Sequence, residues 1–394
     1  MKIKYELAAS SWDTKELEAI QNVLKKNKTT MGECVEIYEQ EFARFVGSKY
    51  CVMVNSGSSA NLLATAALFY KKHSPLKRGD EVIVPAVSWP TTYYPLYQYG
   101  LKLKFVDIDL YTLNYDLEQL SKAVSDKTKM IVVVNLLGNP NKFDRILEMT
   151  KGKDIIILED NCESLGASYQ KKQCGTWGIM GTYSSFFSHH ISTMEGGMIV
   201  TDDEELSQIL VCMRAHGWTR SLPKNNLVAA PKNDNHFEES WRFVLPGYNF
   251  RPIEMMGAIG SEQLKKLPDF LKERVKNAEY FKKKFDNNAY FCLQKEIGTS
   301  SWFGFSLVIK PELQVSRIEL MNFLLKNGVE VRPIVAGNFT KNEVIKYFNC
   351  EIFGDMKNAE YIDKNGFFVG NHHFDIADKI DCFHEICMSF MERQ

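Results

Sequence analysis

The sequence of 394 residues predicts an α/β protein, in which a mostly parallel sheet flanked by helices is followed by a smaller α+β C-terminal part. Three observations support this fold class. Short runs rich in β-branched residues, typical of strands buried on both faces, recur between residues 50 and 158. Segments with apolar residues at helical spacing separate several of these runs, as parallel crossovers require. After residue 253, one long helical segment precedes shorter mixed elements.

Two amphipathic helices are expected before the first strand. Asp13 can cap the first helix, because Glu16 follows three positions later in the pattern of a capping box. Apolar residues then recur at helical spacing as far as Leu24. The second helix is expected over residues 34–46, and it should end at Gly47 because glycine commonly follows the last helical turn.

The larger part should contain five buried strands and helices that connect several of them. The expected strands cover residues 50–54, 81–84, 103–106, 130–134 and 154–158. The expected helices among them cover residues 59–72, 117–124 and 143–150. Open sheets of this type bind ligands beyond the carboxyl ends of their strands. Functional residues are therefore expected at that edge.

The domain boundary is expected where the long C-terminal helical segment begins, which divides the chain into residues 1–253 and 254–394. The long helix should cover residues 254–285, with Pro268 as a candidate break. The elements expected after it are a strand at 305–309, a helix at 317–325, a strand at 329–332 and a terminal helix from residue 376. Together they form a smaller α+β unit.

The composition is that of an ordinary globular protein, with 45% hydrophobic and 25% charged residues. A net charge of −1 gives no reason to expect a nucleic-acid or membrane partner. The start of the chain lacks the apolar core of a signal peptide, and no apolar run reaches the ~18 residues that span a bilayer. A cytoplasmic protein is therefore expected. The nine cysteines contain no Cys-x-x-Cys pair, which favours reduced thiols over disulfides or a metal site.

Residues 55–61, with the sequence Asn-Ser-Gly-Ser-Ser-Ala-Asn, lie between an expected strand and an expected helix. Glycine and small hydroxylated residues at a helix start expose backbone N–H groups and the positive end of the helix dipole, which suits a phosphate. Gly57 and Ser58 are the candidate contacts. A plain strand-to-helix turn with a serine cap explains the same residues equally well.

An acidic pair, Glu159-Asp160, follows the very apolar strand expected at 154–158. An aspartate at the carboxyl end of a strand can pair with the protonated ring nitrogen of a pyridine cofactor and so keep the ring an electron sink. The alternative is a solvent-facing acidic turn. Taken alone, the pair does not decide between these interpretations.

Residues 184–190, Ser-Ser-Phe-Phe-Ser-His-His, are followed by Glu-Gly-Gly at 195–197. The segment looks like the cofactor-anchoring strand of a pyridoxal-phosphate (PLP) enzyme in which histidine replaces the lysine. Lysine binds the cofactor covalently and shuttles protons, whereas imidazole can do only the second. No lysine lies between Lys172 and Lys224 to take its place. A satisfied structural histidine pair or a set of metal ligands is the alternative, although no acid or cysteine at metal-like spacing accompanies it.

The order of these motifs, together with Trp89 in Ser-Trp-Pro and the Arg-Ala-His-Gly at 214–217, resembles the sugar aminotransferase branch of the fold type I PLP enzymes. The resemblance covers nearly the whole chain and implies the aspartate aminotransferase-like fold. Within that branch, histidine in place of lysine is typical of the sugar 3-dehydratases. The sequence of residues 188–197 is similar to that of members that act on GDP-4-keto-6-deoxy-D-mannose. The residues do not decide which nucleotide the substrate carries or whether its sugar is a hexose or a heptose.

The resemblance implies pyridoxal 5′-phosphate or pyridoxamine 5′-phosphate as cofactor and His189 as the catalytic acid and base. The cofactor-binding residues it implies are Gly57, Ser58, Trp89, Asp160, Glu163, Ser184 and Asn249. Asn249 matches a residue that reaches the phosphate from the other subunit, which implies a homodimer with shared active sites. Weaker candidates for the substrate pocket are His216, Arg251 and Glu330, which ordinary interface or surface roles would explain as well.

The implied reaction removes the C3 hydroxyl of a nucleotide-linked 4-keto-6-deoxy sugar, with L-glutamate as amino donor and release of ammonia. A neutral imidazole with a pKa near ~6.5 would suit a group that alternates between base and acid. Dispersed cysteines offer no iron-sulfur spacing, so no iron-sulfur reductase partner is expected. The alternatives are a nucleotide-sugar aminotransferase that uses another lysine, a non-catalytic relative of the PLP enzymes, and a structural scaffold.

Overall fold

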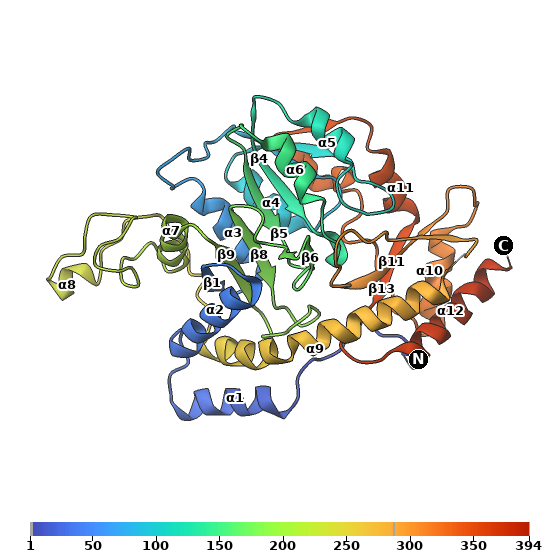
Figure 1. Cartoon of the computed structure of the whole chain (residues 1–394), viewed down its shortest axis with the longest axis horizontal. Helices are drawn as coiled ribbons and strands as arrows, with labels where there is room; N and C mark the ends of the chain where they lie inside the picture. Colours follow the sequence, from blue (N-terminus) through green and yellow to red (C-terminus); the bar gives the residue numbers. More distant parts are fainter. Residues whose placement is uncertain (1–2, 287, 394) are drawn as a thin grey trace.

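The computed structural model describes residues 3–286 and 288–393, and a sheet of eight strands lies at its centre (Figure 1). The strand order is β1-β9-β8-β5-β4-β2-β3-β12. Their bounds are β1 Tyr50–Val54, β2 Glu81–Pro85, β3 Lys102–Val106, β4 Thr128–Val134, β5 Ile156–Asp160, β8 Met180–Ser184, β9 Gly197–Thr201 and β12 Cys350–Phe353. Every pairing is parallel except those of β9, which runs antiparallel to β1 and β8. The mostly parallel sheet is as predicted.

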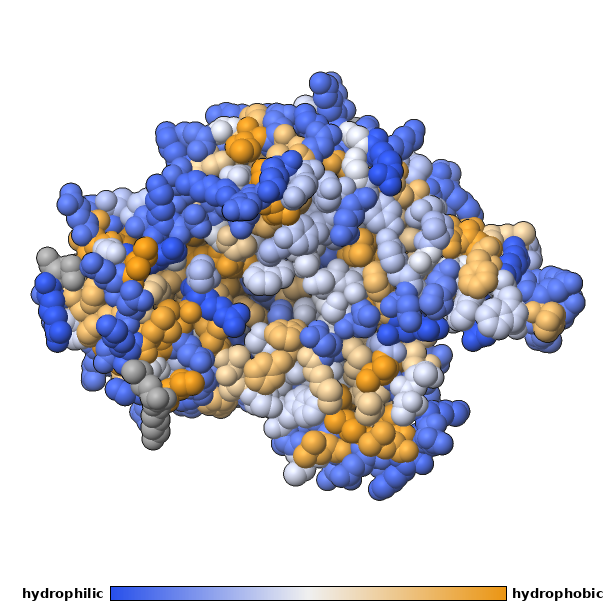
Figure 2. Space-filling model, turned by 180° about the vertical axis from the view of Figure 1, so that it is seen from behind, coloured by the Kyte–Doolittle hydropathy of each residue, from blue (hydrophilic) through white to orange (hydrophobic). Residues whose placement is uncertain are grey.

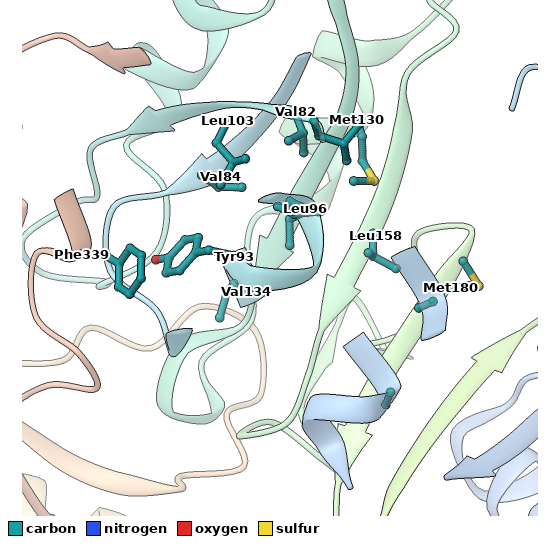
Figure 3. Packing of buried hydrophobic residues seen from close by; sticks show 14 of the residues in the cluster. Val82, Val84, Tyr93, Leu96, Leu103, Met130, Val134, Leu158, Met180 and Phe339 are labelled. Atoms are coloured by element: carbon teal, nitrogen blue, oxygen red, sulfur yellow. The ribbon is translucent and has the colours of Figure 1, made fainter. Parts of the chain in front are cut away.

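Helices cover both faces of this sheet, which explains why its central strands carry apolar residues on both faces. Val82 and Val84 of β2 belong to one apolar cluster with residues of α3 (Gly57–Ala67), α4 (Pro90–Gln98) and α7 (Glu204–Arg214). Ile83, pointing the other way, packs with α5 (Leu117–Ala123) and α6 (Phe143–Thr150). Figure 3 shows the first cluster, with strand side chains beside α4. The carboxyl ends of the strands are left for the loops that form the site.

A long helix, α9 (Glu254–Lys284), joins the large sheet to the C-terminal part. It passes through Pro268 without a break, so the expected break is wrong. A proline removes one backbone hydrogen bond, and packing against α1 (Thr14–Lys25), α2 (Glu33–Val46) and α12 (Ala377–Met391) holds the helix on either side. The capping box of α1 and the end of α2 at Gly47 are both confirmed.

The C-terminal part contains a three-stranded antiparallel sheet, β10-β11-β13, whose strands cover Phe291–Leu293, Gly304–Ile309 and Gly366–Gly370. Its other helices are α10 (Arg317–Lys326) and α11 (Lys357–Asn365). Two segments cross between the parts: β12 pairs with β3, and Tyr5 is buried in the C-terminal apolar cluster. The division between residues 253 and 254 stays a prediction.

Two expected elements differ from the structure. Residues 329–332 form no strand, since only isolated bridges join Val329 to Tyr5 and Arg332 to Phe368. Pro333 follows directly and lacks the N–H that would extend the pairing. The segment 184–190 is likewise not a strand, because β8 ends at Ser184 and the residues after it form a loop.

None of the helices in the described ranges is long and apolar enough to cross a membrane. All nine cysteines lie within these ranges and are free thiols. Met1 and Lys2, which begin the segment judged not to be a signal peptide, lie outside the described residues. The segment around α8 (His236–Glu239) projects from the body, and Figure 2 shows hydrophobic groups among the hydrophilic ones on this projection.

Candidate active site

A cavity of about 340 Å³ lies at the carboxyl ends of β4, β5 and β8, where Val134, Asp160 and Ser184 end their strands. It is closed on one side by the starts of α3 and α4, and the C-terminal part contributes Phe303 and Arg332. Of the residues predicted from the sequence, it brings together Gly57, Ser58, Trp89, Asp160, Glu163, Ser184 and His189. The predicted edge of the sheet is therefore where these residues meet.

The start of α3 forms a narrow polar cradle. Ser56 caps the helix by accepting a hydrogen bond from the Ser59 amide at 3.1 Å. A Cβ atom on Gly57 would lie 2.6 Å from Cβ of Ser184, so only glycine lets the two loops approach this closely. Ser58 donates to the Thr91 hydroxyl at 3.3 Å. Free N–H groups at the helix start and these hydroxyls make a site for a phosphate.

Asp160 lies deep in the cavity as a buried carboxylate. Its Oδ2 accepts hydrogen bonds from Asn61 Nδ2 and Thr92 Oγ1, both at 2.8 Å, and its Oδ1 accepts from the Cys162 amide at 3.2 Å. No lysine, arginine or histidine among the described residues forms an ion pair with it. A buried carboxylate held only by neutral donors is complementary to a cationic ring nitrogen.

Glu163 lies on the cavity wall beside Asp160. Its Oε2 accepts a hydrogen bond from the Leu137 amide at 3.0 Å. Burial raises the pKa of the Glu163 carboxyl to about 7, the Leu137 amide opposes this, and the charge of Asp160 adds to it. Near neutral pH this group can therefore carry a proton and donate it.

His189 follows a tight turn, in which its amide donates to the Phe186 carbonyl at 2.9 Å. Its imidazole lines the cavity, and its buried Nδ1 has no hydrogen-bond partner. Burial lowers the pKa of His189 to about 4, and the cation of Arg274 contributes, so the expected value near 6.5 is wrong for the free protein. The ring is thus a neutral base at neutral pH. The adjacent His190 faces elsewhere and bonds through Nε2 to the Ser301 carbonyl at 3.0 Å.

Four predicted residues lie outside this cavity. Asn249 accepts a hydrogen bond from Nε of Arg251 at 3.1 Å, and Arg251 and His216 both contact the ring of Trp218. Glu330 does not reach the cavity but accepts the amide of Leu7 at 2.8 Å, and Leu7 lines the cavity.

Sequence reasoning missed Asn61, Thr92, Phe303 and Arg332. Asn61 and Thr92 support Asp160 from α3 and α4, and Phe303 enters from a loop before β11. Only Arg332 carried a signal, since it ends the segment 329–332 that had been expected as a strand. An arginine at such an end is a natural ligand for an anion.

Comparison with known proteins agrees with this geometry. Residues 10–373 match the DegT/DnrJ/EryC1/StrS aminotransferase family. The chain is 60% identical, over 98% of its length and 99% of the relative, to GDP-4-keto-6-deoxy-D-mannose 3-dehydratase of Escherichia coli O55:H7. A crystal structure of GDP-4-keto-6-deoxymannose-3-dehydratase with a trapped PLP-glutamate geminal diamine superposes with a TM-score of 0.96 at 60% identity, covering 97% of this chain and 100% of that one.

A histidine-to-asparagine variant of that dehydratase, solved with bound GDP-perosamine, has the same TM-score of 0.96, identity and coverage. The resemblance read from the sequence and the expected fold class are thereby confirmed. The chain belongs to the DegT/DnrJ/EryC1/StrS aminotransferase family and has the fold of the type I PLP enzymes.

Proposed function

We propose that this protein removes the C3 hydroxyl of GDP-4-keto-6-deoxy-D-mannose, using PLP in its pyridoxamine form with L-glutamate as amino donor. The products are the GDP-linked 4-keto-3,6-dideoxy sugar and ammonia. One observation carries the proposal: His189, a neutral base, lines a cavity whose described lining contains no lysine. The relatives that are 60% identical are named as this dehydratase, which supports the choice of substrate.

The residues present fit the cofactor. The cradle at Gly57, Ser58 and Ser184 suits its phosphate, because the Cβ that glycine lacks would fill the space. Asp160 suits the ring nitrogen, since it is a buried carboxylate without a cationic partner. Trp89 is 54% exposed and lines the cavity, so its indole is available to stack on the cofactor ring. When bound, pyridoxamine phosphate supplies an amine that condenses with the ketone and a ring that accepts electrons.

The chain's own residues then move the protons. Neutral His189 would serve as the general base in the cavity, and the imidazolium so formed would donate its proton to the C3 hydroxyl of the sugar, which would leave as water. Asp160, which accepts hydrogen bonds only from neutral donors among the described residues, would pair with the cofactor's ring nitrogen and so keep that nitrogen protonated. Glu163, whose pKa burial raises to about 7, would carry a proton on the cavity wall and supply it to an acceptor on the bound cofactor. No lysine lies among the described lining residues to reclaim the cofactor, so the amino group would leave with the product, and hydrolysis by water would release it as ammonia.

The alternatives are less consistent with this cavity. A sugar aminotransferase would need another lysine within reach, and none lies among the described lining residues. A non-catalytic relative or a scaffold would not need Asn61 and Thr92 to hold a buried Asp160 in place.

The first experiment incubates the purified protein with PLP, L-glutamate and GDP-4-keto-6-deoxy-D-mannose, with the CDP-linked sugar as comparison. Ammonia and a 3-deoxy sugar are the expected products, whereas an amino sugar would identify an aminotransferase. His189→Asn should bind PLP normally and lose dehydration by roughly 10²–10⁴-fold, the usual contribution of a general base. Borohydride treatment followed by mass spectrometry should find no PLP-lysine adduct, and recovery of one would contradict the proposal.

We also propose a homodimer with shared active sites that acts in the cytoplasm. Asn249, His216 and Arg251 lie outside their own cavity. His216 and Arg251 contact Trp218, whose ring meets Trp241 in the segment around α8, and this segment exposes Phe237 and Trp241. Exposed aromatic groups of this kind favour burial against a second copy. If Asn249 serves the partner's cavity, mixing inactive Asn249→Ala and His189→Asn chains should restore about a quarter of the activity, since half the dimers then contain one intact site. No recovery would contradict sharing.

A further inference from the structure

His189 lacks the partner that usually orients a catalytic base. In most such sites a third group hydrogen-bonds to the base and fixes its ring. Within the described residues, Nδ1 of His189 is buried without a hydrogen-bond partner, and the one hydrogen bond of this residue is made by its backbone amide. The ring instead meets two aromatic edges: Phe186 at 6.0 Å between centroids and 78°, and Phe303 at 5.3 Å and 60°. These two aromatic rings therefore pack against the imidazole where a hydrogen-bond partner would otherwise orient it.

Phe186 belongs to the same loop as His189, but Phe303 comes from the C-terminal part and is held independently. The Phe303 amide donates to the Leu137 carbonyl at 3.1 Å. Its carbonyl accepts from Nη1 of Arg274 on α9 at 3.3 Å, and the same nitrogen donates to the carbonyls of Trp302 at 3.3 Å and Asn371 at 3.0 Å. Both the backbone N–H and the backbone carbonyl of Phe303 are therefore held by hydrogen bonds.

Arg274 holds this loop although the burial of its charge is energetically unfavourable. Its side chain is buried at 4% exposure, its Nε has no partner, and it forms no ion pair with a described carboxylate. A buried charge without a counter-ion costs free energy that an apolar side chain would not. The three carbonyls that accept hydrogen bonds from Arg274 belong to Phe303 and to its neighbours Trp302 and Asn371. This arrangement favours a role for Arg274 in placing the Phe303 ring.

The two loops that meet here are also strained. Leu137 and Trp302 both have positive φ, at 53° and 47°, although neither is glycine. A positive φ is unfavourable for a residue with a Cβ atom and persists only where the surroundings hold the residue in place. A Cβ on the intervening Gly138 would lie 2.7 Å from the Trp302 amide nitrogen. The Leu137 amide also donates to Glu163, and the Leu137 carbonyl accepts from Phe303. The same two loops therefore position both the Glu163 carboxyl and the Phe303 ring that packs on His189.

We propose that Phe303, held by Arg274, is a positioning residue that fixes the orientation of the His189 ring for proton transfer. The inference rests on the proposed function, since it assigns Phe303 to the proton-transfer step of that reaction. It differs from a role as a plain wall of the substrate pocket. A wall residue would change the binding of the sugar, whereas a positioning residue changes the rate of every step that uses His189.

The test compares Phe303→Leu, which removes the ring edge, with Phe303→Tyr, which keeps it. Two reactions are followed: cofactor amination by L-glutamate, seen as the absorbance change of PLP, and dehydration, seen as ammonia release. Phe303→Leu should slow both by at least about tenfold with KM for the sugar within about threefold, and Phe303→Tyr should recover most of the rate. Phe305→Leu, in the buried C-terminal cluster, is the control that should keep kcat.

Arg274→Met provides the second variant. Removing the Arg274 cation also raises the pKa of His189, so the comparison is made at a pH where His189 is neutral in every variant. There Arg274→Met should lower kcat as Phe303→Leu does, and the double variant should be no slower than the slower single variant, because both changes then act through the Phe303 ring. If Arg274→Met does not fold, the Phe303 pair still decides. A raised KM with unchanged kcat in Phe303→Leu, or slower dehydration with normal amination, would overturn the inference. Failure of the wild-type protein to release ammonia would instead refute the proposed function.

Discussion

Replacing Glu163 by glutamine should change how the stability of the cofactor-free protein depends on pH. Burial beside Asp160 raises the pKa of Glu163 to about 7 from an ordinary value of 4.5. Between these two values the folded protein holds a proton on Glu163 that the unfolded chain has released. Stability from this group is therefore complete below about pH 4.5 and is lost as the pH rises through about 7.

The magnitude follows from the two pKa values. Their difference of about 2.5, at 1.36 kcal/mol for each unit, gives about 3 kcal/mol in total, of which about 2.5 kcal/mol falls between pH 5 and pH 8. Glutamine has the same shape and its amide oxygen still accepts from the Leu137 amide. It carries no charge to desolvate, so Glu163→Gln should become more stable than the wild type by roughly this amount as the pH rises.

The assay is urea unfolding of both cofactor-free proteins at several pH values from about 5 to 8. Burial also raises the pKa of Glu159 to about 7, but that group is present in both proteins and cancels in the difference. The free energies of unfolding should diverge steadily with rising pH while the denaturant slopes stay equal. Parallel stability curves would refute the argument, since they would mean that Glu163 is ionised over the whole range in the folded protein.

Three further predictions concern the cavity. Gly57→Ala should weaken PLP binding by about tenfold or more in a fluorescence titration, because its Cβ would lie 2.6 Å from Cβ of Ser184; equal affinity would contradict the cradle. Asp160→Asn should still bind PLP but lower kcat by at least about 10²-fold, because a neutral amide cannot keep the ring nitrogen protonated; a normal kcat would exclude that role. Arg332→Met should raise KM for L-glutamate or for the nucleotide sugar by about tenfold, since it places an exposed guanidinium in the cavity; two unchanged KM values would show that Arg332 contacts neither.

The large sheet could be predicted from the sequence because local pattern and final burial agree there. The strands expected at 50–54 and 130–134 lie within β1 and β4, and the helix expected at 143–150 matches α6. The strand expected at 154–158 ends two residues later, at Asp160. Its acidic end remains in the sheet because three backbone amides satisfy Glu159, and Asn61 and Thr92 satisfy Asp160. Propensity alone ends a strand at such acids, and only tertiary hydrogen bonds extend it.

The part of the site built from the C-terminal residues could not be predicted, for a reason that Glu330 and Arg332 illustrate. The two residues flank one position of the same segment, and nothing local distinguishes which side chain faces the cavity. The orientation of each side chain depends on a long-range contact. The Glu330 carboxylate accepts a hydrogen bond from the Leu7 amide, and a backbone bridge to Phe368 aligns Arg332. Phe303 depends in the same way on Leu137 and Arg274, which lie far from it in sequence. Residues that follow strands of the large sheet share an edge by topology, so their meeting is predictable. Residues of the C-terminal part, such as Phe303 and Arg332, reach the cavity only because the C-terminal part packs against the large sheet. A local sequence pattern does not predict that packing.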